Sequence, residues 1–336
     1  METNRIAFID YLKVIGLFCI IFAHLCPDQT LLQIRNFDVP LMILISGYLA
    51  VGSFKRSLEK DKSFLNFYWK RIKRLLLPTW IFLIIFFAVM SLFPIDGIYP
   101  YSTDYIISSF LLLDGMKYVW IIRIFLICAF ITPVIYYFDK IESDYLQFLI
   151  LLVIYVLYEI AIFLQINEMN IIFEFILAYV IPYGIIYLLG MIATKTSYKT
   201  DRNISLIFLA TLLIVGHILY TTTGTVQFTQ IMKYPPRIYY ISYALFVSFL
   251  LFSIFKRIDI KGNRFVTFCS KSSLWIYLWH ALFITVIPLI FVGLDWIVTF
   301  FMVVTCALCV TYIQNKILDF LEKKNLNHGM LKLFRG

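Results

Sequence analysis

RIAFIDYLKVIGLFCIIFAH, residues 5–24, is the stretch that decides the fold class of this chain. It is long and apolar enough to cross a bilayer as one helix, yet it carries Asp10, Lys13 and His24. Lys13 and His24 are eleven residues apart, which places them within about 20° of one another on a helix and about 16 Å apart along its axis. Charged side chains inside a spanning helix are costly and usually line a polar pathway. The stretch therefore predicts a membrane helix whose polar stripe forms the wall of an active site.

The composition of the whole chain places it among membrane proteins. Of its 336 residues, 62% are hydrophobic and 15% charged, whereas a soluble domain carries about 25% charged residues. Long apolar runs indicate helices, because the strands of a β-barrel would be alternating segments of about ten residues. Cys306 and Cys309 have CxxC spacing, but inside an apolar segment this spacing indicates packing rather than a metal site. We expect an all-α, multi-pass membrane protein without a bound metal or a permanently bound cofactor.

Apolar runs of about twenty residues predict ten transmembrane segments. Their approximate cores are residues 6–26, 37–54, 75–93, 118–138, 145–165, 171–193, 204–221, 238–255, 273–292 and 296–315. We interpret residues 1–336 as a single transmembrane domain with a tail from about residue 316 to residue 336.

The distribution of basic residues predicts the orientation of the chain. With the N-terminus in the cytoplasm, the inside segments hold 23 Lys and Arg residues and the outside loops hold four. Those four are Arg35, Lys117, Lys233 and Arg237. The positive-inside rule therefore predicts that both termini are cytoplasmic. The same rule explains the net charge of +9 without a nucleic-acid partner.

Residues 61–74, DKSFLNFYWKRIKR, differ from the other loops because basic residues alternate with aromatic and aliphatic ones. This pattern predicts an amphipathic helix at the cytoplasmic interface, ahead of the third span. Arg71 and Arg74 are three residues apart and so lie on one helix face. In this topology a cationic entrance faces the cytoplasm, and His24 faces the exterior.

This arrangement suits a long anionic donor such as acyl-CoA. Guanidinium groups recognise phosphates, and histidine is the usual general base near neutral pH. We therefore expect the phosphates at Arg71 and Arg74, the pantetheine arm beside Lys13, and the thioester near His24.

Each of these residues also has a structural explanation. Arg71 and Arg74 could anchor the helix at the interface, Lys13 could pair with Asp10, and His24 could be an ordinary interfacial histidine. Two further polar residues lie in apolar segments. Arg123 lies in the fourth segment and is harder to explain structurally; His280 lies within LWIYLWH and could support the site or the packing.

Five motifs, in order along the chain, resemble those of the membrane acyltransferase 3 family. Lys13 to His24 corresponds to the family's Arg-x10-His, and Val39-Pro40 to Ser46-Gly47-Tyr48 corresponds to VP-F-F-x-x-SGY. Arg71 to Arg74 corresponds to Arg-x-x-Arg, and Trp120 to Arg123 corresponds to W-F-L-R. Ser273, Ile276, Tyr277 and His280 correspond to S-x-x-I-Y-x-x-H. Two departures stand out: Lys13 replaces an arginine, and residues 41–43 replace the phenylalanines of the second motif. Lysine keeps the charge but loses the planar bidentate fork.

The resemblance implies transfer of an acyl group, usually acetyl from acetyl-CoA, to a hydroxyl of an extracytoplasmic glycan. It implies that His24 is the catalytic histidine and that Lys13, Arg71 and Arg74 bind the donor or act in catalysis. Arg123 is expected near the thioester oxygen or a charged acceptor group. Ser46 is a further candidate for contact with the substrate or the oxyanion, beside a glycine that would let its helix approach the first helix closely.

We therefore expect a membrane O-acetyltransferase in the cytoplasmic membrane of a bacterium. Its partners would be acyl-CoA, the lipid bilayer, and a cell-surface glycan or lipid-linked sugar as acceptor. Two rivals remain at this stage. A transporter of polysaccharide or small molecules would also need many helices and buried charges, and a sensor would tolerate substitutions at His24, Arg71 and Arg74 together.

Overall fold

Helices, and no strand, make up the regular structure of the residues described in the computed structural model, which are 6–61, 63–93, 101–113, 115–324 and 334. The α-helices are α1 (Ala7–Ala23), α2 (Gln29–Ile34), α3 (Asp38–Asp61), α4 (Phe64–Met90), α5 (Thr103–Phe110), α6 (Trp120–Phe138), α7 (Asp144–Phe163), α8 (Ile171–Phe175), α9 (Ile181–Ile192), α10 (Tyr198–Thr223), α11 (Ile238–Arg257), α12 (Arg264–Lys271), α13 (Ser273–Ile290) and α14 (Trp296–Lys323). Short turns of other helix types are η1 (Lys117–Val119), η2 (Ile166–Glu168), η3 (Ile176–Val180) and η4 (Thr229–Met232).

Nine helical segments among the described residues are long and apolar enough to cross a membrane. α1 has 17 residues, which is below the length of those nine but within the range of spanning helices, about 17–25 residues. Each of the ten predicted apolar segments is helical. The predicted fold class, a helical multi-pass membrane protein, is therefore confirmed.

Two boundaries differ from the sequence-based expectation. Residues 64–74 form the first turns of α4, which continues without a break to Met90, so the amphipathic segment and the third span are one helix. Pro78 lies within this helix. α14 continues to Lys323, so the first residues of the predicted tail are helical, while 325–333 lie outside the described residues.

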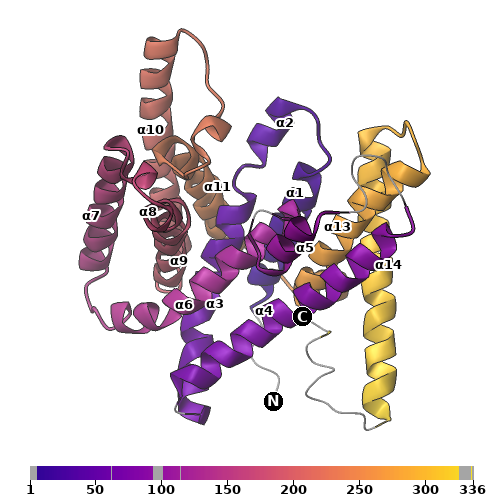
Figure 1. Cartoon of the computed structure of the whole chain (residues 1–336). Coiled ribbons are helices and arrows are strands. Elements are labelled where there is room, and N and C mark those ends of the chain that lie inside the picture. Colours follow the sequence, from indigo (N-terminus) through magenta and orange to yellow (C-terminus); the bar gives the residue numbers. More distant parts are fainter. Residues whose placement is uncertain (1–5, 62, 94–100, 114, 325–333, 335–336) are drawn as a thin grey trace. The chain divides into compact units, whose positions relative to one another are not determined.

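The contacts divide the chain into two units that interleave in sequence. Unit 1 comprises residues 1–16, 28–67 and 127–261, and unit 2 comprises 17–27, 68–126 and 262–336. In unit 1, α10 and α11 run side by side; in unit 2, α13 and α14 do so (Figure 1).

The core of unit 1 is the packing of α3 against α9. A Cβ atom on Gly47 of α3 would lie 1.9 Å from the carbonyl oxygen of Tyr187, and one on Gly190 of α9 would lie 2.0 Å from that of Leu44. The two backbones approach this closely because both helices have a glycine at the crossing, as small residues permit in membrane helices. We predicted that Gly47 would let α3 approach the first helix; this was wrong, because Gly47 faces α9.

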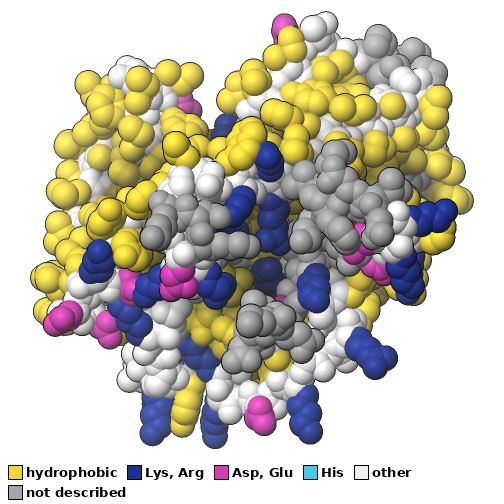
Figure 2. Space-filling view, turned by 90° about the horizontal axis from the view of Figure 1, so that it is seen from below, with side chains coloured by type: hydrophobic (Ala, Val, Ile, Leu, Met, Phe, Trp, Pro, Cys, Tyr) yellow, Lys and Arg dark blue, Asp and Glu magenta, His cyan; other side chains and the backbone are white. Residues whose placement is uncertain are grey.

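The outer helices expose apolar side chains instead of burying them. α9 is buried from Pro182 to Ile192, whereas α7 and α10 expose side chains such as Leu157 and Leu213. Figure 2 shows hydrophobic side chains over much of the surface. Exposed apolar surface of this extent is expected where helices face lipid rather than water.

Candidate active site

His24 and His280 form a pair in unit 2. His24 directly follows the last residue of α1, and His280 is on α13. The Nδ1 atom of His24 lies 3.0 Å from the Nε2 atom of His280. The two rings are nearly parallel, with centroids 5.2 Å apart and an interplanar angle of 13°. A hydrogen bond therefore joins two of the predicted site residues, which lie at the first and the ninth predicted segments.

The surroundings of His280 fix which nitrogen of each ring carries a hydrogen. His280 is fully buried, and its Nδ1 atom is hydrogen-bonded to the carbonyl oxygen of Tyr277. A carbonyl can only accept, so Nδ1 of His280 donates, and Nε2 of the neutral ring is an acceptor. His24 must then donate its Nδ1–H to His280, which makes Nε2 the basic nitrogen of His24.

Two tyrosines hold this pair. The ring of Tyr118, in η1, meets the His24 ring edge-on with centroids 4.8 Å apart. The hydroxyl of Tyr277 donates to the carbonyl oxygen of Tyr118. Tyr277 thus fixes η1 through its hydroxyl and His280 through its carbonyl. We did not single out either tyrosine from the sequence, although Tyr277 lies within the motif that ends at His280 and Tyr118 lies two residues before Trp120.

The other predicted site residues of unit 2 lie on two helices. Arg123 is on the first turn of α6, which directly follows η1, and is half-buried. Arg71 and Arg74 are both on α4, where Arg71 is half-buried and Arg74 is exposed. The three-residue spacing puts the latter two on one face, as expected.

Lys13, Asp10 and Ser46 lie in unit 1. Asp10 is buried and Lys13 half-buried, both on α1. The predicted helix that carries Lys13 and leads to His24 is continuous from Ala7 to Ala23. Ser46 donates its hydroxyl hydrogen to the carbonyl oxygen of Met42, 2.9 Å away and one turn earlier on α3. The predicted functional roles of Ser46, Lys13 and Asp10 stay predictions.

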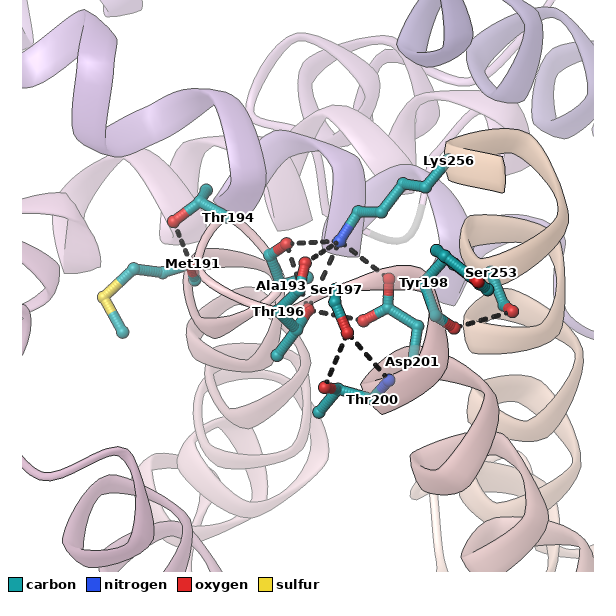
Figure 3. Close-up of polar contacts among 10 residues, drawn as sticks. All are labelled: Met191, Ala193, Thr194, Thr196, Ser197, Tyr198, Thr200, Asp201, Ser253 and Lys256. Atoms are coloured by element: carbon teal, nitrogen blue, oxygen red, sulfur yellow. Dashed lines mark hydrogen bonds and ion pairs between the residues drawn. The ribbon is translucent and has the colours of Figure 1, made fainter. Parts of the chain in front are cut away.

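A second buried polar cluster has a structural character. Lys256 of α11 lies 2.7 Å from Asp201 of α10, and the two side chains are 12% and 0% exposed (Figure 3). The ammonium group also donates to the carbonyls of Ala193 and Thr196, at 2.7 and 3.0 Å. Thr196 donates to the other carboxylate oxygen at 2.5 Å. This network of one ion pair and several hydrogen bonds fastens the α9–α10 connection to the end of α11.

The described residues contain no group of three or more His, Cys, Asp or Glu side chains that could hold a metal ion. A neutral histidine with an oriented basic nitrogen can remove a proton from a hydroxyl group.

The nine long apolar helices found among the described residues define the class of this molecule, a multi-pass membrane protein, and the histidine pair of unit 2 is its candidate site. The sequence profile of a family described as an acyltransferase domain matches residues 6–314. The chain belongs to this family, the acyltransferase 3 family, and is thus a membrane acyltransferase. Searches of curated proteins and of solved structures find no match.

Proposed function

We propose that the protein transfers an acetyl group from acetyl-CoA to a hydroxyl of an extracytoplasmic glycan, with His24 as the general base. The observation that carries this proposal is the hydrogen bond from His24 to His280, since it leaves Nε2 of His24 as the basic nitrogen. The family assignment supplies the reaction class, acyl transfer. The acceptor we favour is a surface polysaccharide or its lipid-linked precursor, reached from the outer side of a bacterial cytoplasmic membrane.

In the proposed step, Nε2 of His24 takes the proton of the acceptor hydroxyl while its oxygen attacks the thioester carbonyl carbon. The tetrahedral intermediate collapses with cleavage of the carbon–sulfur bond. The imidazolium then returns the proton to the leaving thiolate, so the products are the glycan ester and free coenzyme A. We assign to Arg123 the stabilisation of the negative oxygen in the intermediate.

The donor is proposed to enter from the cytoplasmic side. Arg71 and Arg74 offer planar guanidinium groups on one face of α4, and such groups bind phosphates by paired hydrogen bonds. Lys13 stands where the family has arginine and would meet the donor as a point charge.

The test uses purified protein in detergent with acetyl-CoA labelled in the acetyl group. We expect free coenzyme A and an acetylated acceptor without any transmembrane gradient, which a transporter would not produce. His24→Ala should lower the rate by about 10²–10⁴-fold, as removal of a general base does, while the amount of folded protein is unchanged. Full activity of this variant would refute the assignment of His24. In cells, the ester content of surface glycans in a deletion strain and its complement identifies the acceptor.

A further inference from the structure

Two of the four basic residues in the predicted outside loops are buried together in unit 1. Arg35 ends α2, and Lys233 follows η4. The other two have ordinary surroundings, since Lys117 is exposed and Arg237 pairs with Glu159 at 3.2 Å. Loops on the outer side carry few basic residues under the positive-inside rule, so burying half of them at one place calls for a reason.

Among the described residues, only one of the two basic side chains is paired with a carboxylate. The Nη1 atom of Arg35 lies 3.1 Å from Oδ2 of Asp38, and the two side chains are 12% and 1% exposed. The other oxygen of Asp38 accepts the backbone N–H of Val39 at 2.7 Å. Lys233 is 4% exposed, and its ammonium group lies 5.5 Å from the ring centre of Tyr234.

The site is held in place by polar contacts between its two segments. The backbone N–H of Thr229, in η4, donates to the side-chain oxygen of Gln33 at 2.9 Å. The side-chain amide of Asn36 donates to the Thr229 hydroxyl at 3.1 Å, and the hydroxyl of Tyr243 donates to the carbonyl of Ile34 at 2.7 Å. The turn after α2 and the loop around η4 are therefore fixed to one another, and the basic side chains between them are preorganised.

Several hydrogen-bond donors of this cluster are unused among the described residues. The Nε atom of Arg35 and the hydroxyl of Tyr240 are buried without a hydrogen-bond partner there. The ring centre of Tyr240 lies 5.8 Å from the ammonium group of Lys233, which makes no ion pair or hydrogen bond within the described part of the chain. Buried polar groups are normally satisfied, so these donors point to a ligand.

The charge balance leads to the same conclusion. Arg35 is paired with Asp38, whereas Lys233 is influenced by this carboxylate without an ion pair in the described part of the chain. A buried charge without full compensation is unfavourable. Burial lowers the pKa of Lys233 to about 8; the Asp38 carboxylate opposes this effect, and Arg35 adds to it. Lys233 is thus still mostly protonated at neutral pH, and the site carries about one excess positive charge.

Lys256 shows how the same protein treats a buried lysine with a structural role. Its ammonium group is surrounded by a carboxylate and two backbone carbonyls (Figure 3). Lys233 has a comparable burial but none of these partners. Its ammonium group faces the rings of Tyr234 and Tyr240, and such cation–π contacts are weaker than an ion pair. A purely structural role for Lys233 would therefore leave most of its charge uncompensated.

We propose that Arg35, Lys233 and the Tyr240 hydroxyl bind a singly charged oxyanion, namely a carboxylate carried by the acceptor glycan. This inference rests on the proposed function and extends it, because it assigns an acidic sugar, such as a uronic acid, to the acceptor. Both loops are predicted on the outer side, where the acceptor arrives. Arginine provides a planar donor edge for a carboxylate, and one excess positive charge matches one negative charge.

The test measures equilibrium binding of radiolabelled glucuronate and glucose to the full chain in phosphatidylcholine nanodiscs, without acetyl-CoA. We expect saturable binding of glucuronate but not of glucose at about pH 7, and its loss as the pH rises through about 8, when Lys233 loses its proton. Lys233→Met should weaken glucuronate binding at least about tenfold, as loss of a charged hydrogen bond does. The matched control is Lys117→Met, which removes an exposed lysine and should bind as the wild type does.

Thermal unfolding separates a binding role from a structural one. Lys233→Met should unfold at the same temperature as the wild type or higher, since it removes a buried charge that has no ion-pair partner among the described residues. A lower unfolding temperature with unchanged glucuronate binding would overturn the proposal. So would stabilisation by phosphatidylglycerol nanodiscs that depends on Lys233 when glucuronate does not bind, because the site would then hold a lipid phosphate. These binding and unfolding measurements need no catalytic turnover. If the proposed acetyl transfer were not observed, they would still test whether this site binds a carboxylate.

Discussion

Replacing His280 tests whether the histidine pair works as a unit. His280→Phe keeps a ring of similar size in a fully buried position but removes the acceptor 3.0 Å from Nδ1 of His24. His24 then has no fixed tautomer, and the hydrogen can move to the nitrogen that must act as the base. Loss of a hydrogen bond or of a buried hydrogen-bond partner costs about 1–3 kcal/mol of free energy. If this cost falls on the transition state, it corresponds to a decrease in kcat of roughly 5- to 150-fold.

The assay compares kcat for acetyl transfer in His280→Phe, His24→Ala and the double variant. Because His280 acts through His24, the double variant should be no slower than His24→Ala alone. His280→Gln should recover part of the rate, since its side-chain oxygen can accept the same hydrogen.

A neighbouring residue provides the control for packing. Trp279→Phe removes the hydrogen bond from Trp279 to Gln314, which measures 2.9 Å, without touching the histidine pair. It should keep its kcat and its pH profile. Two results would refute the reasoning about His280: wild-type kcat in His280→Phe, or losses that multiply in the double variant.

Three other predictions concern the fold and the donor. Lys256→Met should lower the unfolding free energy by about 3–5 kcal/mol, because it leaves the buried carboxylate of Asp201 without its ion-pair partner. Chemical denaturation in detergent measures this loss, and an unchanged unfolding free energy would contradict the structural role of the pair. Gly47→Ala should lower the unfolding free energy by about 1–3 kcal/mol, because the added methyl group clashes with α9. Gly262→Ala adds a methyl group that meets nothing within 4 Å, so in the same thermal scan it should unfold at the temperature of the wild type. Lys13→Arg should keep or lower the KM for acetyl-CoA, and Lys13→Met should raise this KM about tenfold, the scale of a charged hydrogen bond. Equal KM values for Lys13→Met and the wild type in steady-state kinetics would exclude Lys13 from the donor site.

The sequence predicts the helices of this protein well because the membrane leaves few alternatives. A backbone that crosses lipid must satisfy its own hydrogen bonds, so every long apolar run becomes a helix. Residues 64–74 and the third span differ in composition but form one helix, α4. Basic and apolar residues can share one continuous helix where long cationic side chains reach the interface, and composition changes along such a helix without a break in its hydrogen bonds.

Contacts between helices were harder to predict. The sequence motif around Gly47 indicates a close helix crossing but contains nothing about which helix is crossed, and the partner proved to be α9. The bond between His24 and His280 joins residues 256 positions apart. No local pattern encodes such a pairing, although both residues were singled out as polar groups in apolar segments. Tyr118 was missed because an aromatic residue near a helix start is also typical of membrane interfaces.

The partner of His24 has a consequence for the chemistry. In a triad with a carboxylate, the negative charge stabilises the imidazolium that forms when the base takes a proton. Here the supporting residue is a neutral ring held by the carbonyl of Tyr277, so orientation is fixed without a full opposing charge. An imidazolium that is less stabilised holds its proton less firmly. Under the proposed mechanism the proton must pass on to a thiolate, whose ordinary pKa is about 8.5. A neutral partner therefore suits a base that also has to act as an acid in the same reaction.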